Sequence, residues 1–278
     1  MRKLNNLSEV FDDYETFVID LWGVIHDGIK LNDKAIEAVE QLKSKSKKII
    51  FLSNAPRPSA KVVEFLLKLK MDKQFLSNVM TSGEAAMQAI NQNKFGKKFF
   101  HLGPSRDASI FEKVKSNKTN IDSCDFILCT GLFDEDDPDL NKLQLHENDL
   151  NYYQKFLIKH ISKRLICTNP DLIVHRGNKE EYCAGYIAKI FEELGGDVTY
   201  YGKPHKEIYK MCFEPNEKVL AIGDNLRTDV KGANNINKDC LFITNGVHRN
   251  ELSSNLKLEN VLDKYKVKIN YFQKELQW

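Results

Sequence analysis

The chain has 278 residues, 42% of them hydrophobic, and its 41 basic and 39 acidic side chains nearly cancel. This length suits one large globular domain or two smaller ones. The balanced charge provides no long-range field that would favour nucleic acid or an anionic membrane as a partner. No apolar run approaches about 20 residues, so we expect no membrane-spanning helix.

The cysteines and the N-terminus indicate the compartment. None of the six cysteines forms a Cys-x-x-Cys pair, and several lie in apolar runs such as Cys240–Ile243. Buried free thiols are typical of a reducing compartment. Residues 1–15 lack the apolar centre of a signal peptide. We therefore predict a soluble, cytoplasmic protein.

The first 80 residues alternate between predicted strands and helices. Apolar runs with β-branched residues predict strands over 16–21 and 48–52. Apolar residues at 3.6-residue spacing predict helices over 32–44 and 59–68. This order favours a parallel sheet with right-handed crossovers.

The pattern changes near Thr81. The predicted elements that follow are a helix over 84–91, strands over 98–102, 126–130 and 164–167, an acidic loop over 134–139, and largely helical sequence over 141–163. We interpret residues 81–179 as an α/β domain inserted into a first domain, which consists of residues 1–80 and 180–278.

The first pattern resumes from Tyr182. A helix over 183–193 stops at Gly195-Gly196, a C-cap signal. Strands are predicted over 199–201, 219–222 and 240–244. The tail over 251–278 contains several aromatic residues, so we expect it to dock on the body. The predicted fold class is α/β: a doubly wound, Rossmann-like parallel sheet with an inserted α/β cap.

Four predicted core strands end in a polar side chain. Asp20 lies at the end of the first strand and Ser53 directly follows the second, while Lys203 and Asp224 follow two later strands. In a parallel sheet these ends lie along one edge, where such folds bind ligands. Two clustered acids suit Mg²⁺, and Asp229 would hold a metal-bound water.

A lysine and a hydroxyl beside such a metal suit a phosphoryl group, whose oxygens carry the charge of the transfer. Asp20 is then free to attack phosphorus and form an aspartyl-phosphate. Each residue alone also has a structural interpretation, since an aspartate at a strand end commonly caps a turn. The four in this order favour a catalytic site.

With these motifs the chain resembles phosphatases of the haloacid dehalogenase superfamily, in the class with a large α/β cap. That class includes NagD, p-nitrophenyl phosphatase-like and pyridoxal-phosphate phosphatase-like proteins. The resemblance covers nearly the whole chain, and Thr168-Asn169-Pro170-Asp171 and Cys183-Ala184-Gly185 match this cap class in particular.

The resemblance implies a role for each matching residue. Asp20 falls on the nucleophile, Ser53 on a phosphate-binding hydroxyl, and Lys203, in Gly202-Lys203-Pro204, on the third-motif lysine. Asp224 and Asp229 fall on the metal-binding acids, with Mg²⁺ as the cofactor. Substrate binding is assigned to Asn54, Asn169, Asp171 and Arg176.

One residue departs from the family pattern. The first motif of the family is Asp-x-Asp-Gly, but this chain has Asp20-Leu21-Trp22-Gly23. The backbone carbonyl of Trp22 remains available as a metal ligand, whereas the second carboxyl, the family's general acid and base, is lost. General acid–base help is typically worth about 10²–10⁴-fold in rate, so a substrate with a good leaving group would lose least.

Three residues in or near the cleft have more than one interpretation. His26 is a candidate for the missing acid, because the unperturbed pKa of histidine is near neutrality; a lone loop histidine is more often incidental. Arg176, next to His175, either binds a second anionic group of the substrate or forms an ion pair between domains. Trp22 itself fills apolar space, blocks the leaving-group site or stacks on an aromatic substrate.

The leading hypothesis is a Mg²⁺-dependent phosphatase that hydrolyses a small phosphorylated metabolite. The alternative is a catalytically impaired pseudo-phosphatase that binds a phosphorylated ligand for regulation. A phosphotransferase or mutase is a third possibility, weakened by the loss of the proton shuttle. Family analogy adds a possible homodimer, and no nucleic-acid or membrane partner is expected.

Overall fold

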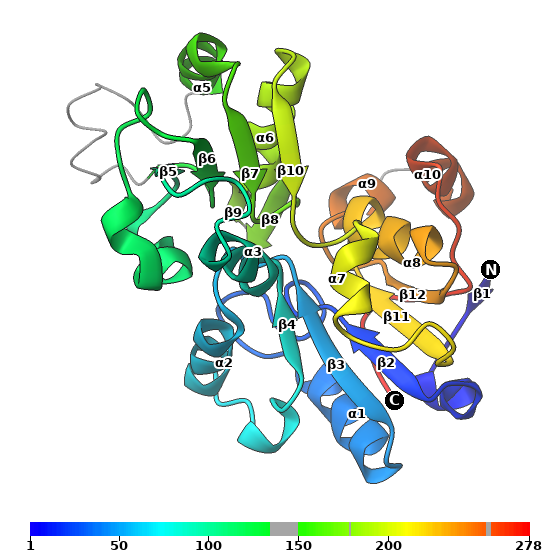
Figure 1. Ribbon diagram of the computed structural model, residues 1–278. Coiled ribbons are helices and arrows are strands. Elements are labelled where there is room, and N and C mark those ends of the chain that lie inside the picture. Colours follow the sequence, from blue (N-terminus) through cyan, green and yellow to red (C-terminus); the bar gives the residue numbers. More distant parts are fainter. Residues whose placement is uncertain (134–149, 178, 254–256) are drawn as a thin grey trace.

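The computed structural model describes residues 1–133, 150–177, 179–253 and 257–278. The chain forms two α/β units, a larger one that contains both termini and a smaller one (Figure 1). The predicted loop over 134–139 and the first part of the predicted helical region over 141–163 lie outside the described residues. None of the helices in the described ranges is long and apolar enough to cross a membrane.

The larger unit contains a seven-stranded sheet with the order β1-β13-β12-β11-β2-β3-β4, in which every neighbouring pair is parallel. Its strands are β1 (Arg2–Lys3), β2 (Thr16–Ile19), β3 (Lys48–Ser53), β4 (Val79–Thr81), β11 (Val219–Gly223), β12 (Asp239–Ile243) and β13 (Tyr271–Gln273). The predicted docking of the tail is confirmed, because β13 is one of these strands.

Helices cover both faces of this sheet, because successive side chains of a strand point to opposite faces. Phe17 and Ile19 of β2 pack in one cluster with α1 and α2, whereas Val18 packs on the other side with α7. The α-helices of the unit are α1 (Asp33–Ser44), α2 (Ser59–Lys68), α7 (Lys206–Lys210), α8 (Lys231–Asn235), α9 (Arg249–Ser253) and α10 (Leu258–Tyr265). Its shorter turns are η1 (Leu7–Glu9), η2 (Phe11–Asp13), η3 (Lys73–Phe75) and the π-type turn η6 (Leu226–Val230).

The smaller unit has a four-stranded parallel sheet with the order β10-β7-β6-β5. Its strands are β5 (Phe99–Leu102), β6 (Phe126–Cys129), β7 (Arg164–Cys167) and β10 (Asp197–Tyr200). The helices are α3 (Ser82–Asn91), η4 (Ser105–Asn117), α5 (Leu150–Leu157), η5 (Ile158–His160) and α6 (Ala184–Glu193). A separate antiparallel hairpin consists of β8 (Ile173–Arg176) and β9 (Lys179–Tyr182).

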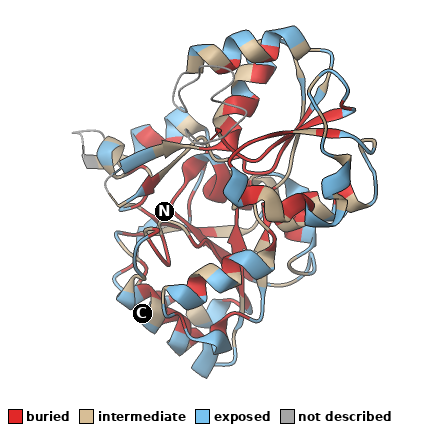
Figure 2. Cartoon of the chain, turned by 90° about the vertical axis from the view of Figure 1, so that its left-hand side faces the viewer, coloured by how far each residue is buried: buried red, intermediate tan, exposed pale blue. Residues whose placement is uncertain are grey.

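Each unit has its own apolar core, and Figure 2 shows the buried residues concentrated along the strands and the inner helix faces. The doubly wound α/β prediction is confirmed. The predicted domain boundary at residue 179 differs from the observed arrangement, because α6 packs on the smaller sheet and β10 pairs with β7. The chain leaves the larger sheet after β4 and returns to this unit only after β10.

Candidate active site

Three of the predicted site residues lie together at one edge of the larger sheet. Strand β2 pairs with β11 on one side and with β3 on the other, which aligns Ile19 with Ile222 and Phe51. The strands therefore deliver Asp20, Ser53 and Asp224 to the same edge, and all three side chains are buried. The sequence predicted this juxtaposition because the strands are parallel.

Lys203 reaches this edge from the segment that follows β10, a strand of the smaller sheet. Asn54 holds its backbone from both sides: the Lys203 N–H donates to Asn54 Oδ1 at 2.8 Å, and Asn54 Nδ2 donates to the Lys203 carbonyl at 3.1 Å. Gly202 has a φ of +112°, and a Cβ there would collide with Asn54 Oδ1. Asn54, predicted to bind substrate, is thus observed to position Lys203.

The ammonium of Lys203 bridges two buried carboxylates. Its Nζ lies 2.5 Å from Asp20 Oδ1 and 2.6 Å from Asp229 Oδ1. Burial opposes the charge of the lysine, but the carboxylates of Asp20, Asp229 and Asp171 outweigh burial and raise its pKa. Lys203 is therefore a permanent cation in this site.

The acids outnumber this cation. Burial raises the pKa of Asp20, an effect that Lys203 opposes and that the carboxylates of Asp229 and Asp224 reinforce. Burial, followed by the charge of Asp229, raises the pKa of Asp224 to about 8. A second positive charge at this place would stabilise the ionised forms of these acids.

Asp20, Asp224 and Asp229 have the geometry and chemistry of a site for a hard divalent cation. One carboxylate oxygen of each lies within 4.8 Å of the others. The Val247 N–H donates to Asp224 Oδ2 at 2.6 Å, and glycines at 23 and 246 leave room where a Cβ would collide with this carboxylate. Oxygen-only donors of this kind suit Mg²⁺. The role of the Trp22 carbonyl as a metal ligand stays a prediction.

Asn169 and Asp171 contact protein groups beside this cluster. The Asp171 N–H donates to Asn169 Oδ1 at 3.0 Å, while Asp171 Oδ1 accepts bonds from Thr228 Oγ1 at 2.9 Å and Asn225 Nδ2 at 3.2 Å. Burial raises the pKa of Asp171 to about 6. The segment after β7 is thereby fixed to the loop that follows Asp224 and carries Asp229. Substrate binding by these two residues stays a prediction.

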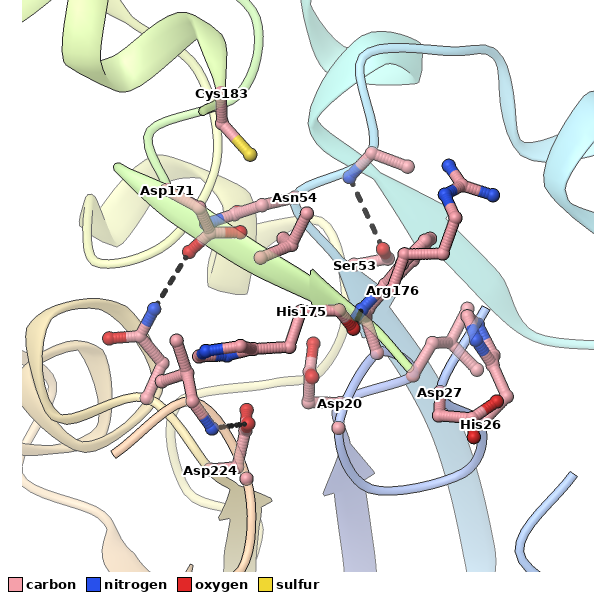
Figure 3. A pocket seen from close by; sticks show the side chains of 18 of the residues that line it. Asp20, His26, Asp27, Ser53, Asn54, Asp171, His175, Arg176, Cys183 and Asp224 are labelled. Atoms are coloured by element: carbon pink, nitrogen blue, oxygen red, sulfur yellow. Dashed lines mark hydrogen bonds between the residues drawn. The ribbon is translucent and has the colours of Figure 1, made fainter. Parts of the chain in front are cut away.

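The side chain of Trp22 points to the β8–β9 hairpin. Its Nε1 donates to the His175 carbonyl at 2.9 Å, and the Arg176 guanidinium lies 5.3 Å from its ring centroid. Gly177, just beyond β8, donates to the Asp27 carbonyl at 3.2 Å and accepts from Arg249 Nη2 at 3.1 Å. The hairpin is thus fastened to the larger unit, and Figure 3 shows its His175 and Arg176 among the residues that line the same pocket as Asp20 and Asp224.

The contacts of His26 argue against its predicted role as the acid. Its Nδ1 accepts the Gly28 N–H at 3.0 Å, and the rings of Trp22 and Phe65 pack against it at centroid distances of 5.2 and 5.4 Å. Burial lowers its pKa to about 4, so the ring is neutral at pH 7. The sequence could not show this, because the packing partners depend on the tertiary structure.

A cavity of about 920 Å³ lies over these residues and is lined by both units. Ser53 lines it, and its Oγ accepts the Ala55 N–H at 3.2 Å, which leaves the hydroxyl proton free to donate to a ligand. Arg57, which no sequence motif marks, also lines the cavity and joins the units through an ion pair with Asp107, at 2.6 Å.

Comparisons with known proteins agree with this arrangement. Residues 17–116 match a family model described as haloacid dehalogenase-like hydrolase, and residues 200–266 match a second model of haloacid dehalogenase (HAD) hydrolase-like proteins. Phosphoglycolate phosphatase 1A from Arabidopsis thaliana is 23% identical over 272 residues, which is 88% of this chain and 73% of that protein.

Two solved structures share the fold over nearly the whole chain. A haloacid dehalogenase-like hydrolase from Brucella suis superposes with a TM-score of 0.81 at 28% identity, covering 98% of this chain and 99% of the other. A p-nitrophenyl phosphatase from Archaeoglobus fulgidus gives a TM-score of 0.70 at 21% identity, with coverage of 95% and 97%.

Proposed function

Because this chain belongs to the haloacid dehalogenase superfamily of hydrolases, we propose that it is a phosphatase acting on a small phosphorylated metabolite. The observation that carries this proposal is the buried cluster of Asp20, Asp224 and Asp229, in which the Lys203 ammonium contacts Asp20 and Asp229. The phosphatases among its relatives support the same reaction.

The reaction has two steps. A carboxylate oxygen of Asp20 attacks phosphorus, and the bond between phosphorus and the leaving oxygen breaks with its electron pair remaining on that oxygen. Water then attacks the aspartyl-phosphate, which releases inorganic phosphate and restores Asp20. Lys203 and the Ser53 hydroxyl bind the phosphoryl oxygens, on which charge is spread during the transfer.

We assign Mg²⁺ as the cofactor. Asp20, Asp224, Asp229 and the backbone carbonyl of Trp22 would hold it, and the bound ion would neutralise charge on the phosphoryl group. The smaller unit acts as the cap that excludes water and selects the leaving group, since it supplies one side of the cavity. Arg176, on the hairpin, binds the leaving-group part of the substrate.

A panel of phosphorylated small molecules with Mg²⁺ tests this function. We expect turnover by the wild type and a loss of at least about 100-fold in Asp20→Asn, which removes the nucleophile but preserves the shape of the side chain. Asp13→Asn, a change of an exposed carboxylate in η2, is the matched control and keeps wild-type activity. Equal rates in the wild type and Asp20→Asn would contradict the proposal.

A second candidate function is the binding of a phosphorylated ligand without efficient turnover. Trp22 favours it, because the position that carries the family's second acid holds an indole here. If the wild type hydrolyses no compound of the panel, while Mg²⁺ and phosphate raise its melting temperature and Trp22→Asp gains activity, binding is the function.

A further inference from the structure

The indole of Trp22 supplies no proton to a leaving group. Its single N–H is already donated to the His175 carbonyl, and the ring lies edge-on to His26. Gly28 is required beside it, because a Cβ there would collide with the indole. The side chain is therefore part of the wall that supports the β8–β9 hairpin.

The titratable groups around Trp22 are also engaged. His26 uses Nδ1 to accept the Gly28 N–H, and Asp27 Oδ1 accepts the N–H groups of Ile29 and Lys30. In His175, Nδ1 is sealed from solvent without a partner among the described residues, and Nε2 lies 3.7 Å from a Glu180 oxygen. His26 Nδ1 and Asp27 Oδ1 therefore have no proton to give, because each accepts backbone N–H groups.

A cation lies against the Trp22 ring. The Arg176 guanidinium lies over the Trp22 ring and borders the cavity, with its Nε 3.3 Å from Glu181. Its side chain is 42% exposed, and its Nη groups make no hydrogen bond to any residue that the structure describes. An arginine supported by an aromatic face has a fixed orientation, and its fork of N–H groups matches a carboxylate or another oxyanion.

We propose that this site expels its leaving group as an anion stabilised by Arg176, without protonating it, and that its substrates are acyl or aryl phosphates. The inference rests on the proposed phosphatase function. In the first step the bond from Asp20 oxygen to phosphorus forms while the bond from phosphorus to the leaving oxygen breaks. The electron pair stays on the departing carboxylate or phenolate, so no proton is transferred in this step.

The dependence of rate on the leaving group tests the inference. The value of kcat/KM is measured for acetyl phosphate, 4-nitrophenyl phosphate, phenyl phosphate and an alkyl phosphate such as glycerol 3-phosphate. We expect the wild type to lose at least about 100-fold from acetyl or 4-nitrophenyl phosphate to the alkyl ester, the scale of general acid catalysis. We expect Trp22→Asp, which restores an acid, to reduce the difference in kcat/KM between these substrates.

Two further variants separate the roles of Trp22 and Arg176. Trp22→Phe keeps an aromatic face and removes the N–H, so it retains the steep dependence. Arg176→Gln lowers kcat/KM for acetyl phosphate at least about 10-fold, and Arg176→Lys restores only part of it, because an ammonium lacks the fork. Because Arg176 is partly exposed, this test stands even if Trp22→Asp fails to fold.

Three outcomes would overturn the inference. Equal rates for alkyl and aryl phosphates in the wild type contradict it but leave the phosphatase function intact. If the wild type shows such equal rates and His175→Gln becomes slower on the alkyl phosphate alone, the His175 imidazole is a proton donor. No hydrolysis of any compound, acetyl phosphate included, would instead refute the proposed function.

Discussion

The Lys203 ammonium lies 2.5 Å from Asp20 Oδ1, although the two residues follow strands of different sheets. Asp20 follows β2 of the larger sheet and Lys203 follows β10 of the smaller one. The same ammonium also contacts Asp229. This contact places the cation at the junction of the two units, so the electrostatics of the site depend on how they pack.

Replacing Lys203 by methionine tests the energetic weight of this contact. Removing one partner of a buried ion pair leaves an uncompensated charge, which typically costs about 3–5 kcal/mol. We expect the free energy of unfolding, measured with guanidinium chloride in metal-free buffer at pH 7.5, to fall by that amount. Saturating Mg²⁺ should restore part of it.

The control for this change is Lys113→Met, which alters an exposed lysine of η4 and should change the free energy of unfolding by less than about 0.5 kcal/mol. If the free energy of unfolding falls by less than about 1 kcal/mol in Lys203→Met, the buried carboxylates do not need the lysine for stability.

The raised pKa of Asp224 predicts how stability depends on pH without metal. Between about pH 4 and pH 8 the folded protein keeps a proton on Asp224, which has a pKa of about 8, whereas the unfolded chain has released it. The free energy of unfolding therefore falls as pH rises, by up to about 1.4 kcal/mol per pH unit. Denaturation series at several pH values measure this slope.

Asp224→Asn should make the slope shallower, because the amide does not titrate, and Mg²⁺ should do the same in the wild type by favouring the ionised carboxylate. Asp13→Asn serves as the control and should keep the wild-type slope. An unchanged slope in Asp224→Asn would show that Asp224 does not hold this proton.

The bond from Trp22 to His175 predicts the mobility of the hairpin. Trp22→Phe removes the donor to the His175 carbonyl while keeping an aromatic ring. We expect a loss of about 1 kcal/mol in the free energy that protects the β8 and β9 amides from hydrogen exchange. Amides of β6, which is buried in the smaller sheet, should exchange as in the wild type. An equal loss of protection in the hairpin and in β6 would indicate global destabilisation.

Loss of the second acid should also slow the second step of the reaction. The family's acid serves as the base that activates water, and Trp22 has no such group, so hydrolysis of the aspartyl-phosphate should limit turnover. Rapid mixing with 4-nitrophenyl phosphate should give a burst of 4-nitrophenolate close to one equivalent per site. A linear time course from the start would place the slow step earlier.

The sequence by itself determined most of the larger sheet and one edge of the site. Each of Asp20, Ser53 and Asp224 lies at the end of a short apolar run, and parallel pairing is enough to bring such ends together. The replacement of the family's second aspartate by Trp22 was also visible in the sequence, because it is a change at one position of a short local motif.

The tertiary structure alone decided which sheet β10 joins and where the side chains near Trp22 point. The short strand predicted over 199–201 is observed as β10 (Asp197–Tyr200), but the sequence does not identify its partner, and β10 pairs with β7 because α6 packs beside it. Trp22 and His175 are 153 positions apart, and His26 is enclosed by Phe65. Such contacts depend on how complete elements pack, which the periodicity of a single segment does not encode.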